Sequence, residues 1–385
     1  MKHYLFLFML IGFIYPTKAF SKNEVFIKRA QQTLDSLYKY YGISHSYLLS
    51  ENYPIQKHNN ITYLASQTQS SNKYSYLWPF SGTFSAVNSL YFSTDDKRYI
   101  QLLNNSVLKG LNNYLDKTRK PTAYASYIKK AGKSDRFYDD NIWIGIDFTD
   151  IYSKTKNRKY ISKAKMIWNF IESGIDNKLN GGVYWCEQKK NSKNTCSNAP
   201  ASVFALKLFL ATSDSSYLKK GKDIYEWTKS HLRDQSDDLY YDNISLNGRI
   251  DKTKYPYNSG QMLQAAVLLY RITNDSCYLY DAQRIAKSCY NYFFVLKNNN
   301  EIALKEENIW FSTVMLRGFI ELYNIDHQPQ YIEAFHQILD TAWNKARDTN
   351  GLLNHDCTGN TKDKTKWLLT QAAYVEMYAR LAPLL

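Results

Sequence analysis

Residues 140–171 have the sequence DNIWIGIDFTDIYSKTKNRKYISKAKMIWNFI, and this stretch contains two helical patterns of different kinds. The first, 140–152, is apolar on nearly every side, so a helix there has to be buried on every side. The second has a single apolar stripe that includes Ile161 and Ile171, which is typical of a helix with one buried face. A polar turn separates the two. The stretch therefore predicts a hairpin of one inner and one outer helix.

The polar turn ends in Tyr160-Ile161, and the same combination of polar turn, tyrosine and aliphatic residue returns along the chain. Its tyrosines are Tyr99, Tyr160, Tyr217, Tyr278 and Tyr331. They are 53 to 61 residues apart, a spacing that fits a helical hairpin with one long loop. Four successive intervals of similar length indicate a repeated unit.

Apolar segments precede these turns and amphipathic segments follow them, with one further segment of each kind. The predicted inner helices are 78–92, 140–152, 200–211, 258–272, 310–323 and 367–381. The predicted outer helices are 22–40, 97–115, 158–173, 215–231, 276–293 and 329–346. Six buried helices enclosed by six amphipathic ones predict an all-α fold, the (α/α)6 toroid.

The predicted connections differ in length according to their direction. Links from an inner to an outer helix are short, such as 93–96 and 213–215. Links from an outer to an inner helix are long: 41–77, 116–138, 174–199, 232–257, 294–309 and 347–365. All long loops therefore fall on one face, at the N-terminal ends of the inner helices. We expect the active site there, because long loops on a rigid scaffold usually carry function.

The composition agrees with long helices. The 385 residues include only 15 Gly and 8 Pro, whereas turn-rich β-sandwiches, barrels and propellers need both. The net charge is +14, which leaves a nucleic-acid partner open. The lysines are scattered rather than clustered, so solubility is the favoured interpretation and no nucleic-acid partner is expected.

The first residues predict a secretion signal. A short basic start at Lys2 and His3 precedes an apolar stretch, and Thr17-Lys18-Ala19 offers a cleavage site after Ala19. We assign 1–19 to the signal peptide and 20–385 to a single catalytic domain. The apolar stretch is too short to span a membrane readily. No cysteine lies near the cleavage site, so we do not expect a bacterial lipoprotein anchor. The mature protein is expected to be secreted or periplasmic, without a membrane span, and monomeric.

The cysteines do not form a dense framework. Cys186 and Cys196 have a spacing that allows one disulfide-closed loop, while the sequence leaves open whether the bond forms. No metal-type Cys/His spacing is present, and G-x-S-x-G, H-E-x-x-H, P-loop and G-x-G-x-x-G motifs are absent from the sequence. No metal or organic cofactor is expected.

Asp139 and Asp140 are the strongest chemical feature. They directly precede a buried helix on the face with the long loops, and neighbouring residues can both reach a cleft only near a helix end. Retaining glycoside hydrolysis needs two carboxyl groups roughly 5–5.5 Å apart. Crowding two like charges also separates their pKa values, so that one stays protonated. The alternative is an N-cap and a first-turn aspartate with a purely structural role.

Two other Asp-Asp pairs show that the dipeptide alone is a weak signal. Asp95-Asp96 lies in a short link on the opposite face and is expected to cap a helix. Asp237-Asp238 lies in a long loop with no apolar helix directly after it. Asp147 shares the helix face of Asp140, seven residues deeper, and a structural hydrogen-bonded role is favoured for it.

Several tryptophans lie where the long loops meet the inner helices. Trp78, Trp143, Trp310 and Trp367 are at or near the predicted starts of inner helices, and Trp185 lies in a long loop. Core packing explains them as well as a cleft does. In a cleft they would form stacking platforms for the C–H faces of sugar rings.

The order of motifs resembles that of glycoside hydrolase family 76, the endo-α-1,6-mannanases. Tyr138-Asp139-Asp140-Asn141 before an aromatic helix is similar to the family's signature. Further similar segments follow in the family's order: Gly181-Gly182-Val183-Tyr184-Trp185, Asn198-Ala199-Pro200-Ala201, Leu239-Tyr240-Tyr241-Asp242 and Tyr255-Pro256-Tyr257-Asn258-Ser259-Gly260. Ser259 stands where the family usually has Gln.

The resemblance implies an (α/α)6 barrel and a retaining mechanism on α-1,6-mannan, with Asp139 as nucleophile and Asp140 as acid/base. By position and resemblance we expect Trp185, Tyr241, Asp242, Tyr257 and Asn258 to bind the substrate. Two alternatives stay open. One is another enzyme on the same toroid, such as an unsaturated glucuronyl hydrolase or an epimerase, and the other is a non-catalytic glycan-binding homologue.

Overall fold

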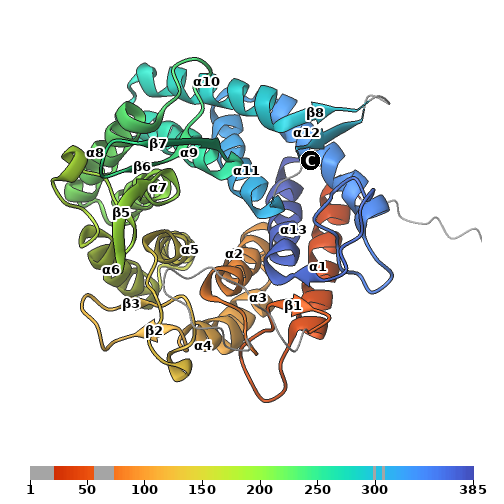
Figure 1. Cartoon of the computed structure of the whole chain (residues 1–385). Coiled ribbons are helices and arrows are strands. Elements are labelled where there is room, and N and C mark those ends of the chain that lie inside the picture. Colours follow the sequence, from red (N-terminus) through yellow and green to blue (C-terminus); the bar gives the residue numbers. More distant parts are fainter. Residues whose placement is uncertain (1–20, 56–72, 298–300, 306–307) are drawn as a thin grey trace, which may run out of the picture.

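The computed structural model describes residues 21–55, 73–297, 301–305 and 308–385. The predicted signal peptide, 1–19, lies outside the described residues. The chain forms a ring of helices in which one set lines the centre and a second set surrounds it (Figure 1). The first and last inner helices pack side by side and close the ring.

The two sets of helices are the predicted ones. The inner helices are α2 (Leu77–Thr94), α5 (Tyr138–Thr155), α7 (Thr195–Thr212), α9 (Pro256–Thr273), α11 (Ile309–Asp326) and α13 (Leu368–Leu381). The outer helices are α1 (Lys22–Tyr41), α3 (Lys97–Leu102) with α4 (Leu108–Leu111), α6 (Arg158–Glu172), α8 (Ser215–Leu232), α10 (Ser276–Phe293) and α12 (Gln330–Thr341). The predicted (α/α)6 toroid is confirmed.

Two outer helices contain a π-helical turn in addition to their α-helical residues. One π-helical turn, Leu103–Val107, joins α3 to α4, and another, Ala342–Ala346, extends α12. Trp367, predicted as the first residue of an inner helix, instead ends a short strand, and α13 begins at Leu368. Short 3-10 turns cover Lys178–Asn180, Lys129–Ala131 and Ala382–Leu384.

Burial follows the two sequence patterns. Ile142, Ile144 and Ile146 of α5 are at most 3% exposed although they point in different directions, because helices surround α5. On α6 the buried and exposed positions alternate with the helical period, and Ile167 is buried while Lys165 faces solvent. The hydrophobic core therefore lies between the two rings and among the inner helices.

The short links explain the tyrosine repeat. Five inner helices end in a residue with left-handed backbone geometry (φ 54–61°), and none of these residues is glycine. They are Asp95, Lys156, Ser213, Asn274 and His327. In four of the links the next residue is an N-cap whose side chain accepts a hydrogen bond from the N–H two residues on, at 2.9–3.1 Å. The tyrosine then falls in the first turn of the outer helix.

The long loops contain short strands that their sequences do not predict. β4 (Tyr184–Cys186), β5 (Lys189–Asn194), β6 (Tyr241–Ser245) and β7 (Ile250–Lys254) form an antiparallel sheet in that order. Three two-stranded pairs are β1 (Asn52–Tyr53) with β10 (Lys366–Trp367), β2 (Leu115–Asp116) with β3 (Ala123–Tyr124), and β8 (Phe294–Leu296) with β9 (Ile302–Leu304). Most of these strands have only two or three residues, too few to show the alternating pattern that marks a strand in sequence, and β5 is polar throughout.

Amide side chains in the first turns of inner helices hold the long loops. Asn141 accepts from the N–H of Tyr124 (2.8 Å) and donates to its carbonyl (2.9 Å). Asn198 forms the same two bonds with Val183 (2.6 and 2.9 Å). Gln371 repeats the arrangement on α13. In α9 the Ser259 hydroxyl accepts a hydrogen bond from the backbone N–H of Tyr240 at 3.0 Å. This shorter side chain therefore supplies one of the two hydrogen bonds that an amide side chain forms at the equivalent place.

Two further expectations concern single residues. Cys186 and Cys196 are both buried free thiols, so the loop between them is not closed by a disulfide in this structure. Asp147 is 2% exposed and accepts a hydrogen bond from the Ser85 hydroxyl at 2.6 Å. Burial raises the pKa of Asp147 to about 7, and the charge of Arg317 acts against this rise. Its contacts agree with the structural role favoured from the sequence.

Candidate active site

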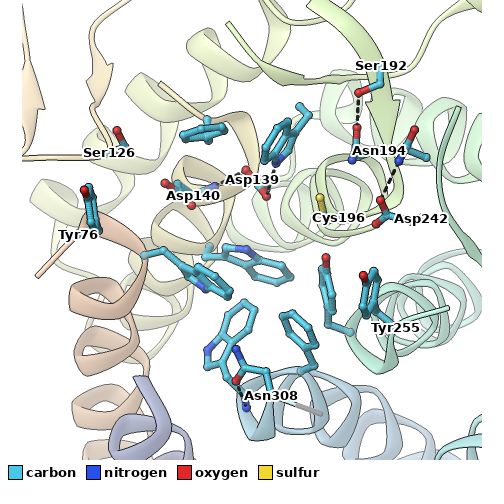
Figure 2. Close-up of a pocket in the computed structure, with 18 of the residues that line it drawn as sticks. Tyr76, Ser126, Asp139, Asp140, Ser192, Asn194, Cys196, Asp242, Tyr255 and Asn308 are labelled. Atoms are coloured by element: carbon cyan, nitrogen blue, oxygen red, sulfur yellow. Dashed lines mark hydrogen bonds between the residues drawn. The ribbon is translucent and has the colours of Figure 1, made fainter. Parts of the chain in front are cut away.

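A cavity of about 690 Å³ opens on the face that carries the long loops. Residues at the starts of the inner helices line it together with residues of the long loops (Figure 2). Asp139 and Asp140 lie in it, together with Trp185, Asp242 and Tyr257. The structure therefore brings together five of the seven residues predicted to form the site.

Asp139 and Asp140 occupy the first turn of α5, where both side chains are partly exposed to the cavity. Asp139 Oδ1 accepts from the backbone N–H of Asp140 at 3.0 Å, and its Oδ2 accepts from the indole Nε1–H of Trp185 at 3.2 Å (Figure 2). The Cys196 thiol also bonds to Asp139. Asp139 thus receives several hydrogen bonds that stabilise its anion.

The two carboxyl groups have different acidities. Burial raises the pKa of Asp139 to about 6, and the bonds from Cys196, Asp140 and Trp185 limit that rise. Burial raises the pKa of Asp140 well above its ordinary value, and the neighbouring charge of Asp139 raises it further. Asp140 is therefore the weaker acid of the pair and Asp139 the stronger, which is the order of acidities that an acid/base and a nucleophile need.

Trp185 is held in place by the turn before it. Gly181 and Gly182 have φ values of 126° and 76°, a region that side chains strongly disfavour. A Cβ on Gly182 would also lie 2.7 Å from the Trp227 ring. The turn directs β4 across the start of α5, where the Trp185 ring packs on Phe137 with centroids 4.8 Å apart.

One side of the cavity is an aromatic wall made by Trp78, Trp143, Trp310, Phe311 and Trp367. Trp310 makes edge-to-face contacts with Trp78 (5.4 Å) and Trp143 (5.2 Å), and Trp78 makes one with Trp367 (5.2 Å). The Tyr257 and Phe311 rings lie 4.2 Å apart. Core packing and a role in the cleft are therefore not alternatives, because each ring packs on its neighbours and also faces the cavity.

Another part of the lining is polar. Asp242 and Asn243 of β6 line the cavity with Ser192 and Asn194 of β5, and the exposed Lys189 lies at the rim. Asn243 donates to the Asp242 carboxylate at 2.8 Å. Burial raises the pKa of Asp242, and this hydrogen bond partly offsets the rise. Such a lining can hydrogen-bond hydroxyl groups while the aromatic wall packs on C–H faces.

Tyr241 and Asn258 are the two predicted site residues that do not line the cavity. Tyr241 begins β6, and the pairing of β6 with β7 is irregular between Tyr241 and Asn243, so strict alternation of faces does not hold there. The Tyr241 ring lies instead under the ammonium groups of Lys252 and Lys254, at 5.9 and 5.5 Å. Asn258 is fully buried in α9 and affects the site indirectly, through an interaction that lowers the pKa of Asp242.

Several lining residues were not predicted as site residues. They are Tyr76, Ser126, Phe137, Asn191, Tyr255, Asn308 and Phe311, together with the polar residues of β5 and β6. Tyr76, Tyr255 and Asn308 are N-caps of inner helices. Their positions follow from the repeat, since the residue before each inner helix faces the same opening. The residues of β5 and β6 had no such signal.

The other Asp-Asp pairs are elsewhere. Asp96 caps α3 on the opposite face, while Asp237 and Asp238 form ion pairs with Lys254 and Arg233. Within the described part of the chain, no group of three or more His, Cys, Asp or Glu side chains is placed to hold a metal ion. None of the described helices is both long enough and apolar enough to cross a membrane.

A toroid with a cavity lined by an acidic pair, aromatic rings and polar side chains is typical of a carbohydrate-cleaving enzyme, a glycoside hydrolase. The profile of glycosyl hydrolase family 76 matches residues 28–310. The chain therefore belongs to glycoside hydrolase family 76, and the resemblance found in the sequence is confirmed.

Solved structures of family 76 enzymes are similar to this chain in fold and sequence. A family 76 glycoside hydrolase described as a mannosidase, from Bacteroides thetaiotaomicron, is 34% identical with a TM-score of 0.85, covering 94% of this chain and 98% of its own. The α-1,6-mannanase of Salegentibacter sp. HEL1_6 is 24% identical with a TM-score of 0.77, covering 94% of this chain and 100% of its own.

A curated relative gives a shorter match. A Schizosaccharomyces pombe protein named for mannan endo-1,6-alpha-mannosidase activity is 22% identical over 228 residues, or 57% of this chain. The match spans about half the length of that relative.

Proposed function

We propose that this protein is an exported retaining mannanase that cleaves internal α-1,6-mannosidic bonds. The observation that carries the proposal is the unequal carboxyl pair at the start of α5. Asp139 receives hydrogen bonds that favour its anion, whereas the pKa of Asp140 is raised well above its ordinary value, first by burial and then by the charge of Asp139. A nucleophile and an acid/base need this order of acidities.

In the first step Asp139 attacks the anomeric carbon and forms a glycosyl–enzyme ester, while the proton of Asp140 passes to the departing glycosidic oxygen. In the second step the Asp140 carboxylate takes a proton from water. The oxygen of that water bonds to the anomeric carbon and releases the Asp139 carboxylate. The configuration is inverted twice and is therefore retained, and the reaction requires water as its only co-reactant.

The relatives support mannan as the substrate class. The Salegentibacter α-1,6-mannanase has been solved as inactive variants, substituted at two consecutive aspartates, in complex with α-1,6-mannotetrose and α-1,6-mannotriose. Asp139 and Asp140 are two consecutive aspartates that line the cavity of this chain. Trp185, Asp242 and Tyr257 are proposed to contact the sugar, and Tyr241 and Asn258 to support them from behind.

The proposal includes secretion or a periplasmic location, from the apolar start of the sequence, and a monomeric state. N-terminal sequencing of the mature protein from the native host tests the first: it is expected to begin directly after Ala19. Light scattering tests the second.

The decisive experiment is digestion of linear α-1,6-mannan with the purified protein. We expect release of oligosaccharides with the α-anomer formed first, observed by NMR during the initial minutes. Equal samples of uronate-terminated oligosaccharides are expected to stay intact, and their cleavage would favour the glucuronyl hydrolase alternative. Binding of mannan with no product, measured by calorimetry, would establish a glycan-binding protein without activity.

A further inference from the structure

Glu51 is a buried carboxyl group that belongs to neither the acidic pair nor the cavity lining. It lies between α1 and β1 and is 1% exposed. Burial raises its pKa to about 7, although two hydrogen bonds act against the rise. A carboxyl group in such a place needs partners, because an unpaired buried one is strongly disfavoured.

Both partners of the Glu51 side chain are lining residues of the cavity. Oε1 accepts from the indole Nε1–H of Trp367 at 2.6 Å, and Oε2 accepts from the backbone N–H of Tyr76 at 2.7 Å. Tyr76 is the N-cap of α2, and Trp367 is the N-cap of α13. One carboxyl group therefore joins the first residues of the first and last inner helices, where the ring closes.

The backbone around Glu51 strengthens this connection. Its carbonyl accepts from the N–H of Leu368 at 2.9 Å, and the next residues pair as β1 with β10, Asn52 opposite Trp367. The main chain fixes the place of Trp367, and the carboxyl group fixes the direction of its indole ring. Glu51 thereby restrains the orientation of a ring that lines the cavity.

The fixed ring lies at one end of the aromatic wall. Trp367 meets Trp78 edge to face at 5.2 Å. In Figure 2, Tyr76 and Ser126 lie on one side of the Asp139–Asp140 pair, and Cys196 and Asp242 lie on the other. A glycan that crosses the acidic pair and continues on the side of Tyr76 would meet the group formed by Tyr76, Trp78 and Trp367, which all line the cavity.

We propose that Tyr76, Trp78 and Trp367 form a sugar-binding subsite away from the acidic pair, and that Glu51 is the residue that positions it. The inference rests on the proposed function for its substrate, a chain of α-1,6-linked mannose units. The subsite binds one hexose of that chain through its C–H face. Glu51 acts through Trp367 and the Tyr76 backbone without touching the sugar.

Glu51→Gln tests the inference, because an amide has one acceptor oxygen for two N–H donors. KM and kcat are measured on linear α-1,6-mannooligosaccharides of two to six units. We expect the KM for the longest substrates to rise about 10-fold while kcat changes less than 2-fold. The KM for the shortest cleaved substrate is expected to stay near that of the wild type, because that substrate does not reach the subsite.

Trp367→Ala provides a second test that does not depend on how Glu51→Gln folds, and it is expected to give the same length-dependent rise. Glu226→Gln is the matched control: this exposed carboxylate on α8 also accepts a hydrogen bond from an aromatic side chain, the hydroxyl of Tyr278 at 3.1 Å. It is expected to leave all constants unchanged. Circular dichroism monitors folding of each variant.

A KM change equal at every chain length, no change, or a loss of kcat alone would overturn the subsite. Failure of the proposed function is a separate result, in which the wild type cleaves none of these substrates. Calorimetric titration of the same oligosaccharides into Asp140→Asn protein, with and without Glu51→Gln, then decides the inference. Length-dependent weakening of binding supports it, and equal binding contradicts it.

Discussion

Two Asp-Asp pairs stand beside inner helices at opposite ends of the toroid, and their environments differ in every respect. Asp95 and Asp96 lie where α2 ends. Asp95 has a left-handed backbone, 72% side-chain exposure and an ion pair with Lys154 at 2.6 Å. Asp96 caps α3, and the pKa of its carboxyl is lowered, first by the hydrogen bond from the Arg98 side chain and then by that from the Arg98 N–H.

Asp139 and Asp140 lie where α5 begins, on the face with the long loops. Loops and aromatic rings remove them from bulk water, and the pKa of each is raised by burial. The comparison shows that the dipeptide has no fixed chemistry. The pair in the tight link is next to solvent and a basic side chain. The pair under the long loops has only a few hydrogen-bond donors nearby, and the repulsion between the two carboxylates adds to the rise in the pKa of Asp140.

The largest expected effect is a loss of activity on substitution of Asp139 or Asp140, but not of Asp95 or Asp96. Asp139→Asn and Asp140→Asn are each expected to lower kcat/KM on α-1,6-mannan by about 10³-fold or more, because each loses a proton-transfer or bond-forming group. Asp95→Asn and Asp96→Asn are expected to keep wild-type rates. Near-normal activity of either α5 variant would show that this pair is structural.

The same α5 variants are expected to melt no earlier than the wild type at pH 7.5. A folded-state pKa above the unfolded value means that stability is lost as the pH rises through the folded pKa. An uncharged Asn removes this loss. Thermal unfolding followed by circular dichroism checks it, and a markedly lower melting temperature would mean that the lost activity reflects unfolding.

The next effect is on the pH profile. Asp139 has to be ionised to attack, so kcat/KM is expected to fall about tenfold per pH unit below pH 6. On the basic side the rate is expected to fall when Asp140 loses its proton. Measurements on mannan from pH 4 to 10 test this, with Asp96→Asn as a variant that should leave both limbs in place. A flat acid limb would contradict the role of Asp139.

A smaller effect is expected from one donor to Asp139. Trp185→Phe keeps a ring on Phe137 but removes the Nε1–H that bonds Oδ2 at 3.2 Å. Since this bond lowers the pKa of Asp139, the acid limb is expected to move to higher pH and the rate at pH 5.5 to fall about tenfold. Trp343→Phe, on an outer helical turn, is the control. If the acid side of the pH profile did not shift, Trp185 would have no effect on the acidity of Asp139, and its role would be contact with the sugar alone.

The smallest effect belongs to the solvent-exposed pair. Asp96→Ala removes the cap of α3, and we expect the melting temperature to fall by about 1–3 °C with no change in kcat/KM. Asp96→Asn, which can still accept the N–H of Arg98, is expected to melt close to the wild type. A loss of activity in Asp96→Ala would mean that the two ends of the toroid are coupled.

Much of the fold could be predicted because its signals are local. The apolar and amphipathic segments lie within one helix each, and the tyrosine turns mark where the two kinds meet. The predicted helix ends differ from the observed ones mostly by a few residues. The place of Asp139 and Asp140 followed from the same signals, since the direction of each helix fixes which end carries the long loop.

The loops were less predictable because their contacts join distant residues. β5 has the polar sequence KKNSKN, and its pairing with β6 exists only because both loops rise from the same face. Asp242 and Asn243 of β6 line the cavity whereas Tyr241 does not, and the register of β6 is irregular between Tyr241 and Asn243. Glu51 accepts a hydrogen bond from the indole of Trp367, which lies 316 residues further along the chain. No sequence pattern connects the two residues.

The sequence by itself determined that the chain forms six helical hairpins, that its long loops gather on one face, and that a carboxyl pair lies at that face. Hydrophobic periodicity and helix direction are properties of short segments, and they suffice for these results. The tertiary structure alone decided which side chains reach the cavity, how the two carboxyl groups differ in acidity, and how the ring closes at Glu51. Those properties depend on burial and on hydrogen bonds between residues that only the closed ring brings together.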